Sequence, residues 1–255
     1  MDAANGRLKF NFETSLGLLG SGGFNQSGSG KSVHWSKENL RKIEAIYEVN
    51  GIGTIYAGQG SMAADAVSSE TDMSGTKLVG SAAVQNSVGG YSFVAAGGAV
   101  GPRINEVYND FNAGRKARVR FDTQEFAGGF KVSVAAGREV LKDGDNNKYY
   151  DAALRYAADT GNMLIKASFG HNRVDVSGAK GWNATVGSFG LLHKDTGLSG
   201  VLTVGDRSDN GNYVYAKAGL QGDWFAFGKT FLSVDAFKSK NMKDSAGTAL
   251  GGGTA

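Results

Sequence analysis

Three acidic residues, Asp65, Glu70 and Asp72, are the only charged residues in a stretch of small and polar residues at positions 51–76. Clustered carboxylates can hold a divalent cation, but these lack the alternating oxygen ligands and closing glutamate of a calcium-binding loop. We predict that the chain has no resident metal or other cofactor. Weak binding of a divalent ion by this loop is kept as an alternative. A connection of about 16 residues without regular structure is usually functional. We expect it to act through its negative charge, with a solvated surface loop as the alternative.

No other set of residues has the spacing of a catalytic or nucleotide-binding site. Residues 28–32 read GSGKS, but the first glycine of a phosphate-binding loop would fall on Asn25. The three histidines, His34, His171 and His193, lie far apart without metal-ligand spacing. No serine stands in the G-x-S-x-G pattern of a hydrolase nucleophile. We therefore predict that the chain is not an enzyme.

The composition excludes several classes of protein. The chain has 255 residues with 40 glycines, one proline, no cysteine and 41% hydrophobic residues. The hydrophobic content excludes a disordered chain, and the lack of a Gly-X-Y period excludes collagen. The absence of cysteine excludes disulfide bonds. A net charge of +3, evenly spread, does not favour nucleic acid as a partner. No apolar run is long enough for a membrane-spanning helix, although a barrel of strands would escape that test.

Alternation of apolar and polar residues predicts β-strands along almost the whole chain. At residues 7–16, for example, Leu8, Phe10 and Phe12 alternate with charged and polar residues. We predict about thirteen strands in a single domain over residues 1–255, too regularly spaced for two unrelated domains. The strands are expected at residues 7–16, 41–49, 53–59, 77–84, 91–96, 117–122, 130–138, 150–156, 164–172, 182–192, 198–204, 212–220 and 225–237.

The connections favour a membrane barrel over a soluble sandwich. Short turns at residues 159–162, 195–197 and 222–223 alternate with longer polar loops at 142–148, 173–181 and 206–211. Such asymmetry is typical of outer-membrane barrels, as are girdles of aromatic residues at strand ends. We expect the girdles to include Tyr149, Tyr150, Tyr156, Trp182, Trp224 and Phe225. In a wide barrel the charged faces of the strands would line a water-filled lumen. The lining would comprise Arg7, Lys9, Lys42, Glu44, Arg118, Arg120, Asp151, Arg155, Lys166 and Lys217.

Several stretches resemble one known family. GTIYAGQG at residues 53–60, SMAAD at 61–65 and DMSGT at 72–76 resemble the fifth strand and third loop of alphaproteobacterial general porins. Further similarity lies in RVRFDT at 118–123, ALRYA at 153–157 and YAKAGLQGDWF at 215–225. Together these stretches span nearly the whole chain, whereas each glycine-rich motif alone is of low specificity.

The resemblance implies a transmembrane antiparallel β-barrel of about 16 strands that assembles as a homotrimer in the lipid of the bacterial outer membrane. It implies passive diffusion of small hydrophilic solutes and ions, with residues 60–76 folded inward as a constriction loop. Asp65, Glu70 and Asp72 would then form the acidic side of the constriction. The opposing basic wall would comprise Arg7, Lys9 and Lys42, with Arg118 and Arg120 as weaker candidates.

The chain departs from the porin pattern at both ends. Its first recognisable strand resembles the third of the family, and residues 246–255 lack a final strand with a terminal aromatic residue. We therefore expect an internal fragment, incomplete at both ends. The alternative function is that of a non-conducting β-rich surface protein, either an adhesin or a structural barrel with a plugged lumen.

Overall fold

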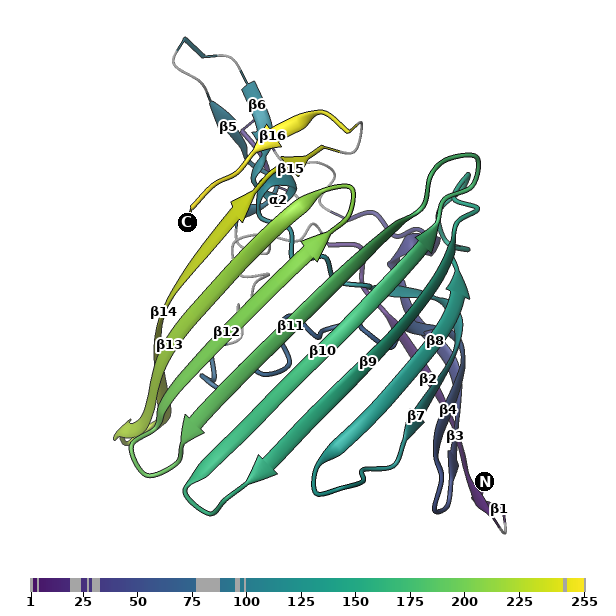
Figure 1. Ribbon diagram of the computed structural model, residues 1–255, viewed down its shortest axis with the longest axis vertical. Coiled ribbons are helices and arrows are strands. Elements are labelled where there is room, and N and C mark those ends of the chain that lie inside the picture. The colour runs from purple at the N-terminus through teal and green to yellow at the C-terminus, as the bar shows by residue number, and fades with distance from the viewer. Residues whose placement is uncertain are drawn as a thin grey trace.

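A computed structural model describes residues 2–3, 5–18, 24–26, 28, 33–76, 88–94, 97–98, 100–244 and 247–254 of the chain. Its main feature is one antiparallel sheet of twelve strands whose neighbours in space follow the chain order (Figure 1). The strands are β1 (Asp2–Ala3), β2 (Gly6–Thr14), β3 (Leu40–Val49), β4 (Gly53–Ser61), β7 (Arg115–Thr123), β8 (Phe130–Arg138), β9 (Lys148–Asp159), β10 (Met163–Asp175), β11 (Trp182–His193), β12 (Leu198–Arg207), β13 (Gly211–Phe225) and β14 (Gly228–Lys240).

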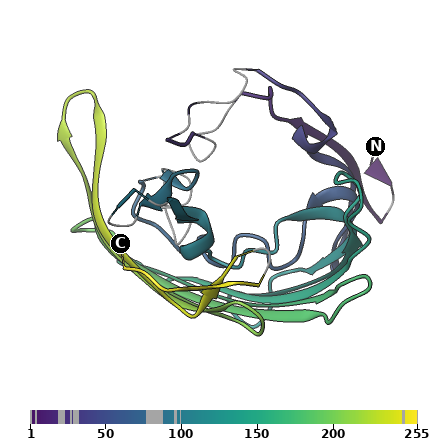
Figure 2. The same cartoon turned by 90° about the horizontal axis from the view of Figure 1, so that it is seen from above.

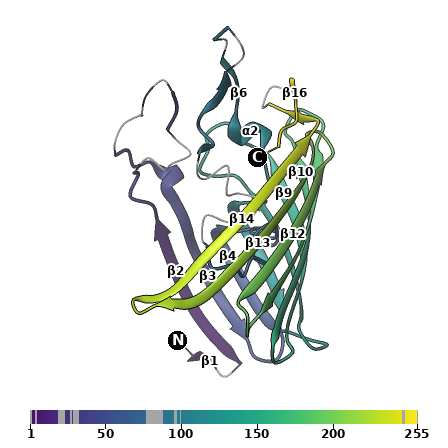
Figure 3. The same ribbon diagram turned by 90° about the vertical axis from the view of Figure 1, so that its left-hand side faces the viewer.

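The sheet is strongly curved, and its two ends come round toward each other (Figures 2 and 3). Among the described residues, β1 and β14 are its edges, and no pairing joins them. The predicted all-β, antiparallel class is therefore confirmed. The eleven longer strands of this sheet each contain a predicted strand or most of one, because alternation of side chains is a direct consequence of the extended backbone.

The smaller elements lie at the end of the sheet that is uppermost in Figure 1. They comprise two hairpin-like sheets, β5 (Ser92–Val94) with β6 (Val100–Arg103) and β15 (Met242–Lys243) with β16 (Ala249–Gly251), and a single helical turn, α2 (Ile104–Val107). A 3-10 turn, Lys37–Asn39, precedes β3. None of the helices in the described parts of the chain is long and apolar enough to cross a membrane.

One part of the predicted strand series is wrong. Part of the strand expected at residues 91–96 is present as β5, which pairs with β6 outside the main sheet. Instead, β4 pairs directly with β7, so residues 62–114 are inserted between two adjacent strands. Alternation reports that a segment is extended but carries no information about which sheet it joins. The other strand expected in this region, at residues 77–84, lies outside the described residues.

The connections differ in length between the two ends of the sheet, although less regularly than predicted: residues 222–223, expected as a turn, lie inside β13, and residues 124–129 form a six-residue connection at the short-turn end. Short turns at residues 50–52, 160–162, 194–197 and 226–227 lie at the lower end in Figure 1. The longer connections, which join β2 to β3, β4 to β7 and β8 to β9, leave and re-enter the sheet at the upper end. The loop expected at 206–211 is only a three-residue turn, residues 208–210, because β12 and β13 extend further than their apolar residues indicate.

The two faces of the sheet have opposite character. We call the concave face, which carries residues of the 62–114 insertion (Figure 2), the inner face and the other the outer face. The outer face is apolar and accessible: Phe169 is 51% exposed and Leu202 is 50% exposed. The inner face holds buried polar residues such as Thr203, which is fully buried. A water-soluble domain has the reverse distribution, with its large apolar residues inside.

Two of the aromatic residues expected at the rim of the outer face lie on the inner face instead. Tyr149 and Trp182 alternate in register with the inner-face residues Asp151 and Ala184, and both line an internal pocket. Tyr150, in contrast, is 42% exposed. A position near a strand end does not determine which face of the sheet a residue lies on. Successive side chains alternate between the two faces, so a shift of one residue changes the face.

The largest apolar cluster lies inside the curve, near the upper end of β13 and β14. It joins inner-face residues of the sheet to what we call the aromatic segment, residues 104–113, which includes Tyr108 and Phe111. The Tyr108 ring meets Phe237 edge-on with 5.5 Å between centroids, and Phe111 meets Tyr213 at the same separation. Edge-on aromatic pairs are favourable beyond their buried area, and they fix the aromatic segment to the inner face.

The assignment of faces can be tested on β12, because the chain has no cysteine of its own. With Leu202→Cys, we expect rapid reaction with N-ethylmaleimide in the folded, detergent-solubilised protein. With Thr203→Cys, we expect reaction only as fast as the protein unfolds, because that position is fully buried. The measurement is the rate of mass increase by mass spectrometry. Equal rates at the two adjacent positions would contradict the assignment.

Candidate functional site

Residues 62–76 cross the inner face of the sheet from β9 to β14, and we call them the inner loop. The loop begins where β4 ends at Ser61, and its first turn is bound by a carboxylate of β9. Asp151 accepts hydrogen bonds from the backbone N–H groups of Ala63 at 3.1 Å and Ala64 at 2.7 Å. Asp151 is buried, so these donors satisfy a group that would otherwise be costly to remove from water.

Arg155, on the same strand, binds the loop at two places. Its Nε lies 2.8 Å and 2.9 Å from the two carboxylate oxygens of Glu70. Its Nη2 donates to the carbonyl oxygen of Ala63 at 2.8 Å and more distantly, at 3.4 Å, to that of Asp65. One guanidinium therefore holds the beginning and the later part of the inner loop together, using donors fixed in one plane.

Hydroxyl groups of the next strands bind the middle of the loop. Ser188 of β11 donates from Oγ to the carbonyl oxygen of Val67. Thr203 of β12 donates from Oγ1 to the carbonyl oxygen of Ser68 at 3.0 Å. The Ser68 hydroxyl in turn donates to Asp110 at 2.8 Å, which links the inner loop to the aromatic segment. Buried backbone carbonyls need such partners, because no water reaches them.

A buried ion pair fixes the end of the loop. Lys217 of β13 places Nζ 3.0 Å from a carboxylate oxygen of Asp72, and the two side chains are only 1% and 2% exposed. Lys217 also donates to the Thr76 hydroxyl at 2.6 Å, and that hydroxyl lies 3.0 Å from Ser233 of β14. Breaking a buried pair by removing one partner typically costs about 3–5 kcal/mol, because the other charge is left unpaired.

Glycines in the strands make room for the loop. A Cβ on Gly190 of β11 would lie 2.0 Å from the carbonyl oxygen of Thr71. A Cβ on Gly170 of β10 would lie 2.9 Å from Ala64, and one on Gly219 of β13 would lie 2.7 Å from Ser74. These distances are shorter than a carbon can approach. The inner loop therefore packs directly against the backbone of the sheet. Only glycine fits at these three positions, which we call the glycine track.

The three predicted acidic residues belong to the inner loop, and their direct partners were missed. Glu70 pairs with Arg155 and Asp72 pairs with Lys217, both on the strands that carry the loop. Asp65 is half-buried and contributes its backbone carbonyl to Arg155. Alternation along β9 and β13 assigns Arg155 and Lys217 to the inner face, but it does not indicate which acid each of them meets.

Two predicted basic residues lie where the inner loop begins. Arg118 pairs with Glu44 of β3 and donates to the carbonyl oxygens of Ser61, at 3.0 Å, and Gly58, at 3.1 Å. Arg120 binds Asp122 through two bonds, of 2.6 Å and 2.8 Å, and donates to the carbonyl oxygen of Met62 at 2.9 Å. Both arginines therefore position the start of the loop, a role that their residue type alone did not predict.

The other three predicted basic residues lie on β2 and β3, away from the loop contacts described above. Lys9 pairs with Glu48, and Lys42 lies 3.0 Å from Glu13. Arg7 lies on the same face of β2 as Lys9, two residues away, and is exposed. The opposition of these residues to the acids of the inner loop stays a prediction, since the direct partners of Glu70 and Asp72 are other cations.

The described residues support no metal-binding constellation. No group of three or more histidine, aspartate or glutamate side chains in the described ranges could hold a metal ion. His171 and His193 bind neighbouring threonine hydroxyls, Thr185 at 2.9 Å and Thr196 at 2.8 Å. Neither histidine lies in the inner loop.

Comparison with known proteins gives no independent assignment: no protein-family model matches the sequence, and no curated protein matches it.

The glycine track can be tested with a matched pair of substitutions on β11. Gly190→Ala forces a carbon against the Thr71 carbonyl, and we expect a loss of about 1–3 kcal/mol in the free energy of unfolding. Gly187→Ala is the control, because the nearest atom to its added carbon lies 3.9 Å away. We expect the control to change stability by less than about 0.5 kcal/mol. Urea unfolding measures both, and similar losses would show that the loop does not touch β11.

The buried ion pair can be tested by comparing Lys217→Met with the double substitution Lys217→Met and Asp72→Leu. The single change leaves the Asp72 carboxylate buried and unpaired, with an expected cost of about 3–5 kcal/mol. The double change removes both charges and should recover most of that loss.

Whether the loop stays docked is measured separately, as the rate of cleavage after Glu70 by a glutamate-specific protease. We expect faster cleavage only in the single variant, because the released loop exposes its backbone. Equal stability of the single variant and the unchanged protein would mean that the pair does not hold the loop.

Proposed function

We propose that this chain forms part of the wall of a water-filled channel through which small hydrophilic solutes and ions diffuse passively across a bacterial outer membrane. The observation that carries the proposal is the reversed character of the two faces of the sheet. An apolar outer face is favourable when lipid surrounds it, and a charged inner face is favourable when it borders water. The resemblance to general porins further supports assembly as a homotrimer.

The inner loop would narrow such a channel. It crosses the inner face of the sheet at the level where Arg155, Thr203 and Lys217 bind it. Its acids are neutralised in part by the two cations of the wall, so a residual negative charge lies on this side. The basic residues of β2 and β3, such as Lys9 and Lys42, would face it and create a transverse field that sorts solutes by charge and dipole.

A plugged, non-conducting barrel is the second candidate. It is favoured by the aromatic segment, whose residues Val107, Tyr108 and Phe111 are buried inside the curve of the sheet. If this apolar cluster closed the lumen, the inner loop would serve stability alone. The two candidates differ in one measurable property, which is ionic conductance.

The deciding experiment is the conductance of the purified protein in planar lipid bilayers, together with reversal potentials in a salt gradient. We expect discrete conductance steps, and we expect Glu70→Gln to lower the preference for cations, because it leaves Arg155 without its counter-charge. Asp159→Asn is the control, since this acid lies in an exposed ion pair with Lys194 at the short-turn end of the sheet. Protein that inserts into the bilayer but does not conduct would favour the plugged barrel.

A further inference from the structure

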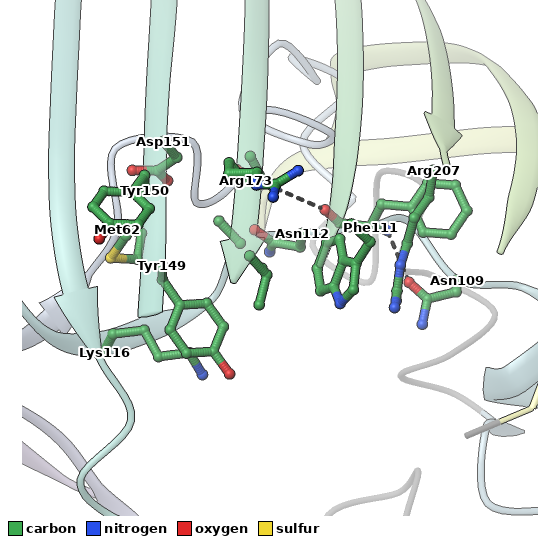
Figure 4. Close-up of a pocket in the computed structure, with 14 residues that line it drawn as sticks. Met62, Asn109, Phe111, Asn112, Lys116, Tyr149, Tyr150, Asp151, Arg173 and Arg207 are labelled. Atoms are coloured by element: carbon green, nitrogen blue, oxygen red, sulfur yellow. Dashed lines mark hydrogen bonds between the residues drawn. The ribbon is translucent and has the colours of Figure 1, made fainter. Parts of the chain in front are cut away.

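A second concave site lies between the aromatic segment and the inner face of the sheet (Figure 4). It is a pocket of about 260 Å³, lined by residues of β7, β9 to β12, the first residue of the inner loop and the aromatic segment. This volume lies near the lower limit of small-molecule sites, which range from about 300 to 1,000 Å³. The pocket is therefore suited to a ligand of few atoms.

The lining includes three cations, Arg173, Lys116 and Arg207, and Figure 4 shows the last two on opposite sides of the pocket. Aromatic rings of the lining hold both in place. The Arg207 guanidinium lies 3.7 Å from the centroid of the Trp182 ring, and Lys116 Nζ lies 4.5 Å from that of Tyr149. Such contacts favour a fixed position for the cation. The acidic partners of these two cations, Glu139 and Asp209, are not part of the lining.

The acidic partner of Lys116 remains charged. Burial opposes ionisation of the Glu139 carboxyl, but hydrogen bonds from Lys116 and from the backbone N–H of Leu141 outweigh it and hold the pKa of Glu139 below its usual value. The one carboxylate in the lining, Asp151, is already occupied by two N–H groups of the inner loop. Among the lining residues themselves the cations therefore outnumber the carboxylates, while the acids that pair with Lys116 and Arg207 lie outside the lining.

Two asparagines add hydrogen-bond donors to the pocket. The side-chain oxygen of Asn109 accepts the backbone N–H of Phe111 at 2.8 Å, and that of Asn112 accepts the N–H of Ala66 at 3.0 Å. These bonds fix the orientation of both amides, because a side-chain NH2 group cannot accept a hydrogen bond from N–H. No described residue accepts a hydrogen bond from either Nδ2. The pocket thus offers donors from asparagine, lysine and arginine.

We propose that this pocket binds a small organic carboxylate with a flat apolar body, such as an aromatic acid. The carboxylate supplies acceptor oxygens and negative charge to the donors, which strengthens each hydrogen bond. The apolar body covers the rings and side chains of Tyr149, Phe111 and Met62, as pocket walls of this kind require. An inorganic anion would leave these walls uncovered, and a neutral aromatic alcohol would offer the donors only an uncharged, weaker acceptor.

Binding at this pocket does not depend on conduction, so it can be measured with the full chain in detergent solution. The probe is benzoate, titrated by calorimetry, with benzyl alcohol and sulfate as comparisons. To locate binding, Trp35→Phe and Trp224→Phe leave Trp182 as the only tryptophan, because the chain has three. We expect benzoate to bind and to change the Trp182 fluorescence. Failure to bind, or binding of either comparison compound as tightly as benzoate, would overturn the proposal.

The matched substitutions are Asn109→Asp and Asn112→Asp. Each keeps the oxygen that accepts a backbone N–H but replaces the Nδ2 donor by a carboxylate oxygen. We expect at least about tenfold weaker binding of benzoate in each, through one lost hydrogen bond and added repulsion.

Asn39→Asp is the control, because the Asn39 side-chain oxygen likewise accepts a backbone N–H, from Ser36 at 2.7 Å, but the residue is outside the lining. Unchanged affinity in both pocket variants, or equal weakening in the control, would contradict the proposal. If benzoate binds but the protein does not conduct, the pocket proposal stands and the channel proposal fails.

Discussion

The structure depends on one constraint: a loop without regular secondary structure is buried against a sheet, and each of its polar groups must find a partner there. A buried backbone group without a hydrogen bond costs roughly 1–3 kcal/mol. The sheet supplies these partners with one polar side chain after another, from Asp151 on β9 to Lys217 on β13, although the buried Thr71 hydroxyl has none. Loop and sheet therefore specify each other, since neither a shifted loop nor a flatter sheet would keep these bonds.

The same constraint gives the charged residues two roles. Glu70 and Asp72 would set the charge of a channel, but they also fasten the loop through Arg155 and Lys217. A change in charge at Asp72 is therefore also a change in stability, because that pair is almost fully buried. Glu70 is more accessible, with 28% of its side chain exposed, so charge and stability are easier to separate there.

The sequence allowed the strands and the acidic loop to be predicted, but not how they meet. Alternation along residues such as Phe169 and Leu202 follows from local geometry and needs no knowledge of the rest of the chain. The pairing of Asp72 with Lys217 joins residues 145 positions apart. The sequence also does not predict the glycine track, because Gly190 is one of 40 glycines and no neighbouring residue distinguishes it from the others. The pairing of β4 with β7 was missed because the intervening residues contain extended segments of their own.

The position of the inner loop also constrains the order in which the protein can fold. The loop is made from residues 62–76, yet its partners on β11 to β13 come more than a hundred residues later. Hairpins between consecutive strands close short loops at low entropic cost, whereas these contacts close very long ones. Docking of the loop is therefore a late event, which follows assembly of the strands that receive it. Until then the charged side chains of the loop are exposed to solvent. Its acidic residues keep the loop hydrated while the sheet forms around it.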